Sequence, residues 1–136
     1  MIVLDEQLLG RGIEHDIARW YQGKVQFIID IRPHTVIKDN AIPMLLRQQS
    51  RPTFVTINEG DFWQRVPGDP RYCVVCFALS DARTGEIPHS LRALFRRPEF
   101  RPKGQRMGKV IRVTQEEISY YTLPARQMTT IAVEGS

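Results

Sequence analysis

The chain lacks any apolar run of the length that crosses a membrane, so we expect no transmembrane segment. It also lacks a basic N-terminal segment, and Asp5 and Glu6 interrupt the first apolar run, so we expect no signal peptide. Histidine is scarce, with three residues scattered along the chain and no Cys and His cluster that would predict zinc. Internal repeats and low-complexity segments are missing too. These absences leave a single domain of ordinary size, which we place in the cytoplasm.

Cysteine is almost as scarce, because Cys73 and Cys76 are the only two. Their spacing suggests a redox or metal motif at first. However, both lie in an apolar run typical of a strand, and residues three apart on a strand face opposite sides. We therefore predict two buried thiols that behave as small apolar side chains and form no disulfide.

Basic residues are present and concentrated in one stretch. The formal net charge is +4, and the stretch between residues 92 and 109 has a single acid, Glu99. Such a stretch is typical either of a surface that binds a polyanion or of a well-solvated face, and both interpretations stay open here. Its basic members are Arg92, Arg96, Arg97, Arg101, Lys103, Arg106 and Lys109.

Apolar runs alternate with helical periodicity along the chain. Strands are predicted at residues 2–4, 25–29, 53–57 and 72–79, and helices at 7–21, from 39 or 40 onward, after 58, and at 89–97. Two further strands at 109–114 and 118–123 predict a hairpin, and residues 129–133 predict a last strand or a docked tail. This order predicts an α/β fold with a mostly parallel sheet covered on both faces and a C-terminal β-hairpin.

Polar side chains follow three of the predicted strands. Because the carboxyl ends of parallel strands share one edge of a sheet, we expect these side chains to converge. Carboxylates that converge need a cation, and hard oxygen ligands without Cys or His favour Mg²⁺ or Mn²⁺, ions that support phosphodiester hydrolysis. For Asp5 alone, a helix-capping role is the simpler hypothesis. The side chains concerned are Asp5, Glu6, Asp39, Asn58, Glu59 and Asp61.

Three parts of the sequence that contain these side chains also carry a family resemblance. They are residues 5–8, the acid that opens the second helix, and residues 56–62. Together they resemble the PIN-like superfamily, most closely its short VapC-like branch, over roughly residues 1–80. The resemblance implies one domain, 1–136, folded as a three-layer α/β/α sandwich. It also implies a Mg²⁺- or Mn²⁺-dependent ribonuclease, often the toxin of a toxin–antitoxin pair. By position, Asp5, Asp39 and Asp61 would be the catalytic metal ligands.

The chain departs from the family motif at one point. The motif runs Thr-x-Asp-x-Asp-Phe, whereas here Asn58 replaces the first Asp and one extra residue precedes Asp61. Asn keeps an oxygen ligand but loses a charge. A weak or inactive PIN-like module that binds a protein partner or RNA therefore stays open as the alternative. Supporting roles beside the proposed metal are assigned to Glu6, Asn58, Glu59 and Thr56.

The expected partners follow from the same hypothesis. RNA would be held through its phosphates by Lys38, Arg92, Arg96 and Arg97. A protein antitoxin and a second copy of the chain are the other candidate partners. A phosphate-accepting receiver domain also carries an acid pair after its first strand, but it needs an Asp at the end of the third strand. Residues 56–58 offer none, so this interpretation ranks last.

Overall fold

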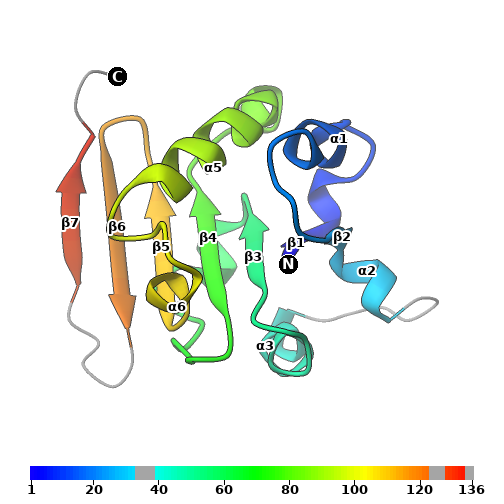
Figure 1. The fold of residues 1–136 in the computed structure, drawn as a ribbon, viewed down its shortest axis with the longest axis horizontal. Coiled ribbons are helices and arrows are strands. Elements are labelled where there is room, and N and C mark those ends of the chain that lie inside the picture. Colours follow the sequence, from blue (N-terminus) through cyan, green and yellow to red (C-terminus); the bar gives the residue numbers. More distant parts are fainter. Residues whose placement is uncertain (33–38, 123–127, 134–136) are drawn as a thin grey trace.

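Seven strands form one sheet in the order β2-β1-β3-β4-β5-β6-β7 (Figure 1). In the computed structural model the chain is described over residues 1–32, 39–122 and 128–133. Strands β1 to β5 pair in parallel, and β6 and β7 continue the sheet in antiparallel fashion. This confirms the predicted α/β class, the mostly parallel sheet and the C-terminal hairpin. The strands are β1 (Ile2–Leu4), β2 (Val25–Phe27), β3 (Thr53–Thr56), β4 (Cys73–Phe77), β5 (Lys109–Val113), β6 (Glu117–Thr122) and β7 (Thr129–Ala132).

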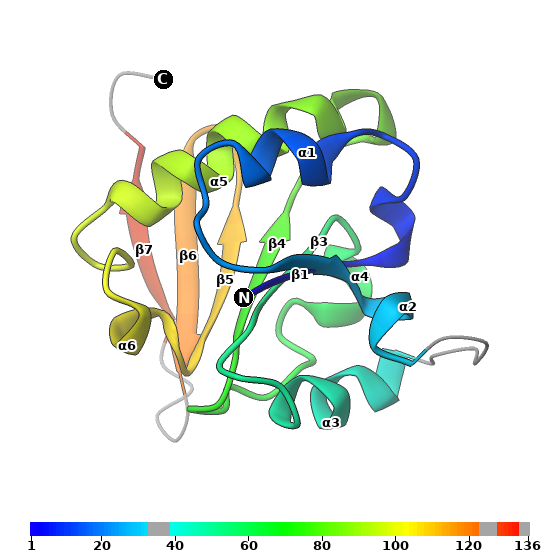
Figure 2. The same cartoon turned by 45° about the vertical axis from the view of Figure 1, so that its right-hand side comes forward.

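The central strands are apolar because helices cover the sheet on both faces. Successive side chains of a strand alternate between two hydrophobic cores, so Leu4 enters one core and Val3 the other. The first core includes residues of α1 (Ile13–Ala18) and α5 (Ile87–Arg96). The second includes residues of α3 (Ile42–Arg47) and α4 (Glu59–Phe62). Figure 2 shows α1 and α5 together on one side of the sheet and α3 on the other.

The two cysteines follow this alternation. Cys73 lies in the core beneath α1 and α5, and Cys76 lies in the core beneath α3 and α4. Both thiols are free and buried. Burial raises the pKa of Cys73 to about 12 and raises that of Cys76 as well. The prediction that the thiols diverge and act as small apolar side chains is confirmed.

The predicted helix over residues 7–21 is wrong in its first half. A short 3-10 helix, η1 (Glu6–Leu8), follows β1, and α1 begins only at Ile13. Between them, Gly10 and Gly12 take φ values of 75° and 74°, a left-handed conformation that interrupts a helix and that glycine adopts without strain. Arg11 is consequently presented on a loop between the two glycines.

Other boundaries also differ from the predictions. The second strand ends at Phe27, since Ile28 and Ile29 belong to α2, and the basic helix begins two residues earlier than predicted, at Ile87. The remaining helical segments are short. They are α2 (Ile28–Ile31), η2 (Asp39–Ala41), η3 (Asp81–Glu86) and α6 (Lys103–Arg106).

The five parallel strands follow the order 2-1-3-4-5, so the direction of winding reverses between β1 and β3. The connections through α1 and α4 run in opposite directions on opposite faces, which gives them the same hand. The connection from β4 to β5 runs in the direction of the α4 connection, but α5 lies on the α1 face. It therefore has the opposite hand, a left-handed exception to a rule obeyed in about 98% of cases.

Candidate functional site

The site begins where β1 and β3 end side by side, at the point of reversal. Asp5 follows β1 and is 5% exposed. Its Oδ1 accepts a hydrogen bond from the Glu6 N–H at 2.8 Å, and its Oδ2 accepts one from the Thr56 hydroxyl at 2.7 Å. Asp5 thus caps η1, as the simpler hypothesis held, and is also tied to the end of β3. The cap uses one carboxylate oxygen and the contact with Thr56 uses the other.

The charge of Asp5 is only weakly compensated. Burial raises the pKa of its carboxyl, while the hydrogen bonds from Thr56 and Glu6 oppose that rise. The negative charges of Glu6 and Asp61 raise the pKa further. Among the described residues, the groups that act on this buried carboxyl are therefore neutral donors and other acids. An added cation would favour its ionised form.

A chain of hydrogen bonds connects Asp5 to Asp61. The Asn58 N–H donates to Thr56 Oγ1 at 3.0 Å, so Thr56 links Asp5 to the turn after β3. Asn58 then caps α4, because its Oδ1 accepts from the Asp61 N–H at 3.2 Å. Its Nδ2 donates to Asp61 Oδ2 at 2.6 Å. Thr56 and Asn58 therefore hold the two acids in a fixed relation.

Glu59 lies at the start of α4 and has a partner that the sequence analysis missed. Its Oε1 lies 3.2 Å from Nη2 of Arg112, on β5. Arg112 pairs in register with Cys76, which pairs with Thr56, so these residues form one row across three strands. The sequence carried only part of this signal: strand alternation places Arg112 on the same face as Val110, but nothing local points to Glu59, 53 residues away.

Of the remaining predicted acids, Glu6 and Asp39, the structure describes the side chain of Glu6 only. Glu6 is exposed beside Asp5. Asp39 opens η2 with its backbone, but its side chain and all of Lys38 lie outside the described residues. Asn40, the neighbour of Asp39, lines a hollow of about 380 Å³ together with Asp61. The backbone of η2 therefore lies near α4, as the predicted convergence requires.

The carboxylates do not form a complete metal cage in what the structure describes. Across residues 1–32, 39–122 and 128–133, no group of three or more His, Cys, Asp or Glu side chains is arranged to hold a metal ion. What the fold does bring together is one buried carboxylate, Asp5, and a second, Asp61, linked through Thr56 and Asn58.

The basic stretch is not one surface. Arg92 and Arg96 are exposed on α5, whereas Arg97 is half-buried, with its Nε 3.6 Å from Glu99 Oε2. Arg92 and Arg96 lie over the sheet face opposite to the one covered by α4, which carries Glu59 and Asp61. A ligand that contacts both groups must therefore pass from one face of the sheet to the other.

The second half of the basic stretch folds to the amino edge of the sheet, where α6 lies (Figure 1). Arg106 is 6% exposed, and its Nη1 donates to the carbonyls of Phe100 and Arg101 at 2.9 and 2.8 Å. Its guanidinium also lies 4.0 Å from the centre of the Phe95 ring. Lys109 Nζ donates to the Glu99 carbonyl at 2.9 Å. Arg106 is therefore turned into the protein, whereas Lys109 is partly buried and held by a backbone carbonyl.

A membrane-spanning helix is not found in the described ranges, where every helix is too short or too polar. Comparison of the chain with family models, curated proteins and solved structures gave no match. The functional argument therefore rests on the geometry of the carboxyl edge.

Proposed function

We propose that the chain is a PIN-like, three-layer α/β/α domain that hydrolyses RNA with the help of Mg²⁺ or Mn²⁺. The observation that carries this proposal is the environment of Asp5. It is a buried carboxylate at the winding reversal of a doubly wound sheet, where such folds bind ligands. Neutral donors and other acids surround it. No basic side chain of the described residues contacts its carboxylate, so a bound cation would provide the missing compensation.

The donor set suits these ions. Mg²⁺ is usually held through one or two carboxylates, with waters and substrate phosphates as its other ligands. Asp5 and Asp61 would provide the two carboxylates, and in the proposal Asp39 adds a third from η2. When bound, the ion would activate water and stabilise the charge of the phosphodiester. Carboxylate and amide oxygens are hard ligands, which favours Mg²⁺ or Mn²⁺ over zinc.

The protein's own residues would orient this set. The Thr56 hydroxyl fixes one oxygen of Asp5, and Asn58 fixes the side chain and backbone of Asp61. The ion pair with Arg112 holds Glu59 toward β5. In the proposal, Arg92, Arg96, Arg97 and Lys38 contact more distant phosphates, and the protein works in the cytoplasm under the control of an antitoxin.

A second candidate function is an RNA- or protein-binding module without turnover. It is favoured by the contacts of Asn58, which engage both an oxygen and the backbone N–H of Asp61. The replacement of an acid by Asn58 thus leaves Asp61 partly satisfied inside the protein. A second copy of the chain is a further partner for such a module.

The proposal is tested by metal-dependent stability and RNA cleavage in wild type and Asp5→Asn. Mn²⁺ at a hundred times its Kd should stabilise the wild type by about 2.7 kcal/mol, and Asp5→Asn should lose most of this gain. Cleavage of a single-stranded RNA should fall by about 100-fold or more. Asp30→Asn, at an exposed acid on α2, is the matched control and should behave as wild type.

Two results would contradict the proposal. An equal Mn²⁺ shift of the melting temperature in wild type and Asp5→Asn would mean that Asp5 is not a ligand. RNA binding without cleavage at any Mg²⁺ or Mn²⁺ concentration would favour the module without turnover.

A further inference from the structure

A polar crevice of about 530 Å³ opens at the carboxyl edge, next to the proposed site. Its walls come from the segments that follow β1, β3 and β4, so it lies outside the carboxyl ends of adjacent strands. Asn58 belongs both to this crevice and to the hydrogen-bond chain that links Asp5 to Asp61. The crevice and the acids are therefore contiguous. Its lining residues are Gln7, Arg11, Ile57, Asn58, Leu79 and Asp81.

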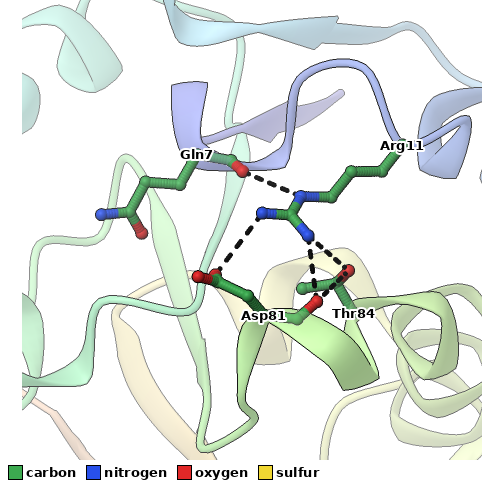
Figure 3. Close-up of polar contacts among 4 residues, drawn as sticks. All are labelled: Gln7, Arg11, Asp81 and Thr84. Atoms are coloured by element: carbon green, nitrogen blue, oxygen red, sulfur yellow. Dashed lines mark hydrogen bonds and ion pairs between the residues drawn. The ribbon is translucent and has the colours of Figure 1, made fainter.

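One wall of the crevice is locked by Arg11 (Figure 3). The Arg11 Nε donates to the Gln7 carbonyl at 3.1 Å, and its Nη1 donates to the Asp81 carbonyl at 2.9 Å and to Thr84 Oγ1 at 3.2 Å. Its Nη2 lies 3.4 Å from Asp81 Oδ1. These contacts fasten the loop after β1 to η3 after β4, so the crevice is pre-formed.

The lining chemistry indicates the ligand. The guanidinium of Arg11 is already engaged by Asp81, so the crevice offers no free positive charge for a phosphate. It offers instead the carboxamides of Gln7 and Asn58, while Ile57 and Leu79 contribute the smaller, apolar part of a mostly polar lining. In Figure 3 the Gln7 carboxamide extends away from Arg11. A nucleobase has matching properties, with a flat apolar face and an edge of donors and acceptors.

We infer that this crevice binds one base of single-stranded RNA, that of the nucleotide next to the cleaved phosphodiester. The inference rests on the proposed ribonuclease function and adds what sets its sequence preference. The RNA must be single-stranded there, because only an unpaired base exposes the edge that a carboxamide can contact. Gln7 is the residue expected to contact that edge, while Asn58 joins the base site to the acids.

Nucleotide binding tests the crevice without any need for cleavage. Protein labelled with ¹⁵N is titrated, free of metal, with the four nucleoside 5′-monophosphates and with ribose 5-phosphate. We expect the side-chain NH₂ signals of Gln7 and Asn58 to shift with nucleotides and not with ribose 5-phosphate. Gln7→Ala should weaken binding about fivefold, the loss of one hydrogen bond. Gln22→Ala, at an exposed residue before β2 on the opposite edge, should bind as wild type.

Equal shifts with ribose 5-phosphate, or equal affinity in Gln7→Ala and wild type, would overturn the base site. A cleavage experiment separates this failure from that of the proposed function. With Mn²⁺ and a pool of RNA sequences, Gln7→Ala should cut with a relaxed base preference beside the cut. Cleavage with an unchanged preference would reject the crevice and keep the ribonuclease. Nucleotide binding at Gln7 without cleavage would reject the ribonuclease and keep the base site.

Discussion

The two edges of the parallel sheet bury charges of opposite sign and compensate them differently. At the amino edge, burial lowers the pKa of Arg106 and of Lys109. At the carboxyl edge, burial raises the pKa of Asp5. In each case desolvation disfavours the charged form, so burying the charge costs free energy at both edges. The neighbours of these groups decide what the charges do.

At the amino edge the compensation comes from the protein itself. Backbone carbonyls accept from Arg106 and Lys109, and aromatic rings lie against both cations. At the carboxyl edge Asp5 receives two hydrogen bonds from neutral donors, and Glu6 and Asp61 add repulsion. The amino edge is therefore a structural clamp, whereas the carboxyl edge suits a cation that comes from solution.

The largest effect on stability is expected when the structural clamp at the amino edge is disrupted. Arg106→Ala removes the donor to the Phe100 and Arg101 carbonyls and the cation over the Phe95 ring. We expect a loss of about 3 kcal/mol in the free energy of unfolding, measured by urea denaturation. Arg96→Ala, at an exposed arginine on α5, is the control and should stay within about 0.5 kcal/mol of wild type.

Arg106→Ala should respond to Mn²⁺ as wild type does, because the clamp lies at the opposite edge of the sheet from Asp5. If Arg106→Ala proved as stable as Arg96→Ala, the buried cation would contribute nothing and the contrast between the edges would disappear.

A smaller effect concerns pH. The pKa of Asp5 in the folded protein is raised above its ordinary value of 3.8. Stability associated with protonated Asp5 is therefore fully present below the unfolded pKa and is lost as pH rises through the folded pKa. Without metal, the free energy of unfolding of wild type should fall relative to that of Asp5→Asn as pH rises through that window. At higher pH the two free energies should change with pH in the same way. Urea midpoints measured upward from below pH 4 check this.

Saturating Mn²⁺ should abolish or reverse this loss in wild type, because the bound ion favours the ionised carboxyl. Asp30→Asn should keep the wild-type profile. A wild-type profile that runs parallel to that of Asp5→Asn throughout would mean that Asp5 is well compensated within the protein.

Local patterns were enough to predict much of the fold and part of the site. The apolar run before Asp5 predicted a buried strand with an acid at its end, and the structure confirms both. Strand alternation correctly sent Cys73 and Cys76 into different cores. The hairpin pattern predicted the pairing of β5 with β6. In each case the deciding forces act between near neighbours, so the sequence alone carries the signal.

Features set by distant contacts were not predictable in this way. A right-handed connection would have placed α5 over the α4 face, but packing of Trp20 against Phe95, with ring centres 6.0 Å apart, accompanies its position beside α1. The basic stretch gave no sign that Arg106 is buried while Arg96 is exposed. The Glu59–Arg112 ion pair joins residues 53 positions apart. Such choices depend on tertiary packing, which no local period records.

The smallest effect is expected in a test of whether the exposed arginines of α5 contact RNA that is bound at the carboxyl edge. Helix α5 follows η3, which begins at that edge, so RNA held near Asp5 can reach Arg92 by passing over the edge. If Arg92 contacts a phosphate, Arg92→Ala should lower the slope of log affinity against log salt by about 0.7 for single-stranded RNA. Arg71→Ala, at an exposed arginine just before β4 on the amino edge, should leave the slope unchanged. Binding is measured in EDTA, so that cleavage cannot interfere. The opposite result, a lower slope in Arg71→Ala and an unchanged one in Arg92→Ala, would place the RNA along the amino edge, away from the acids.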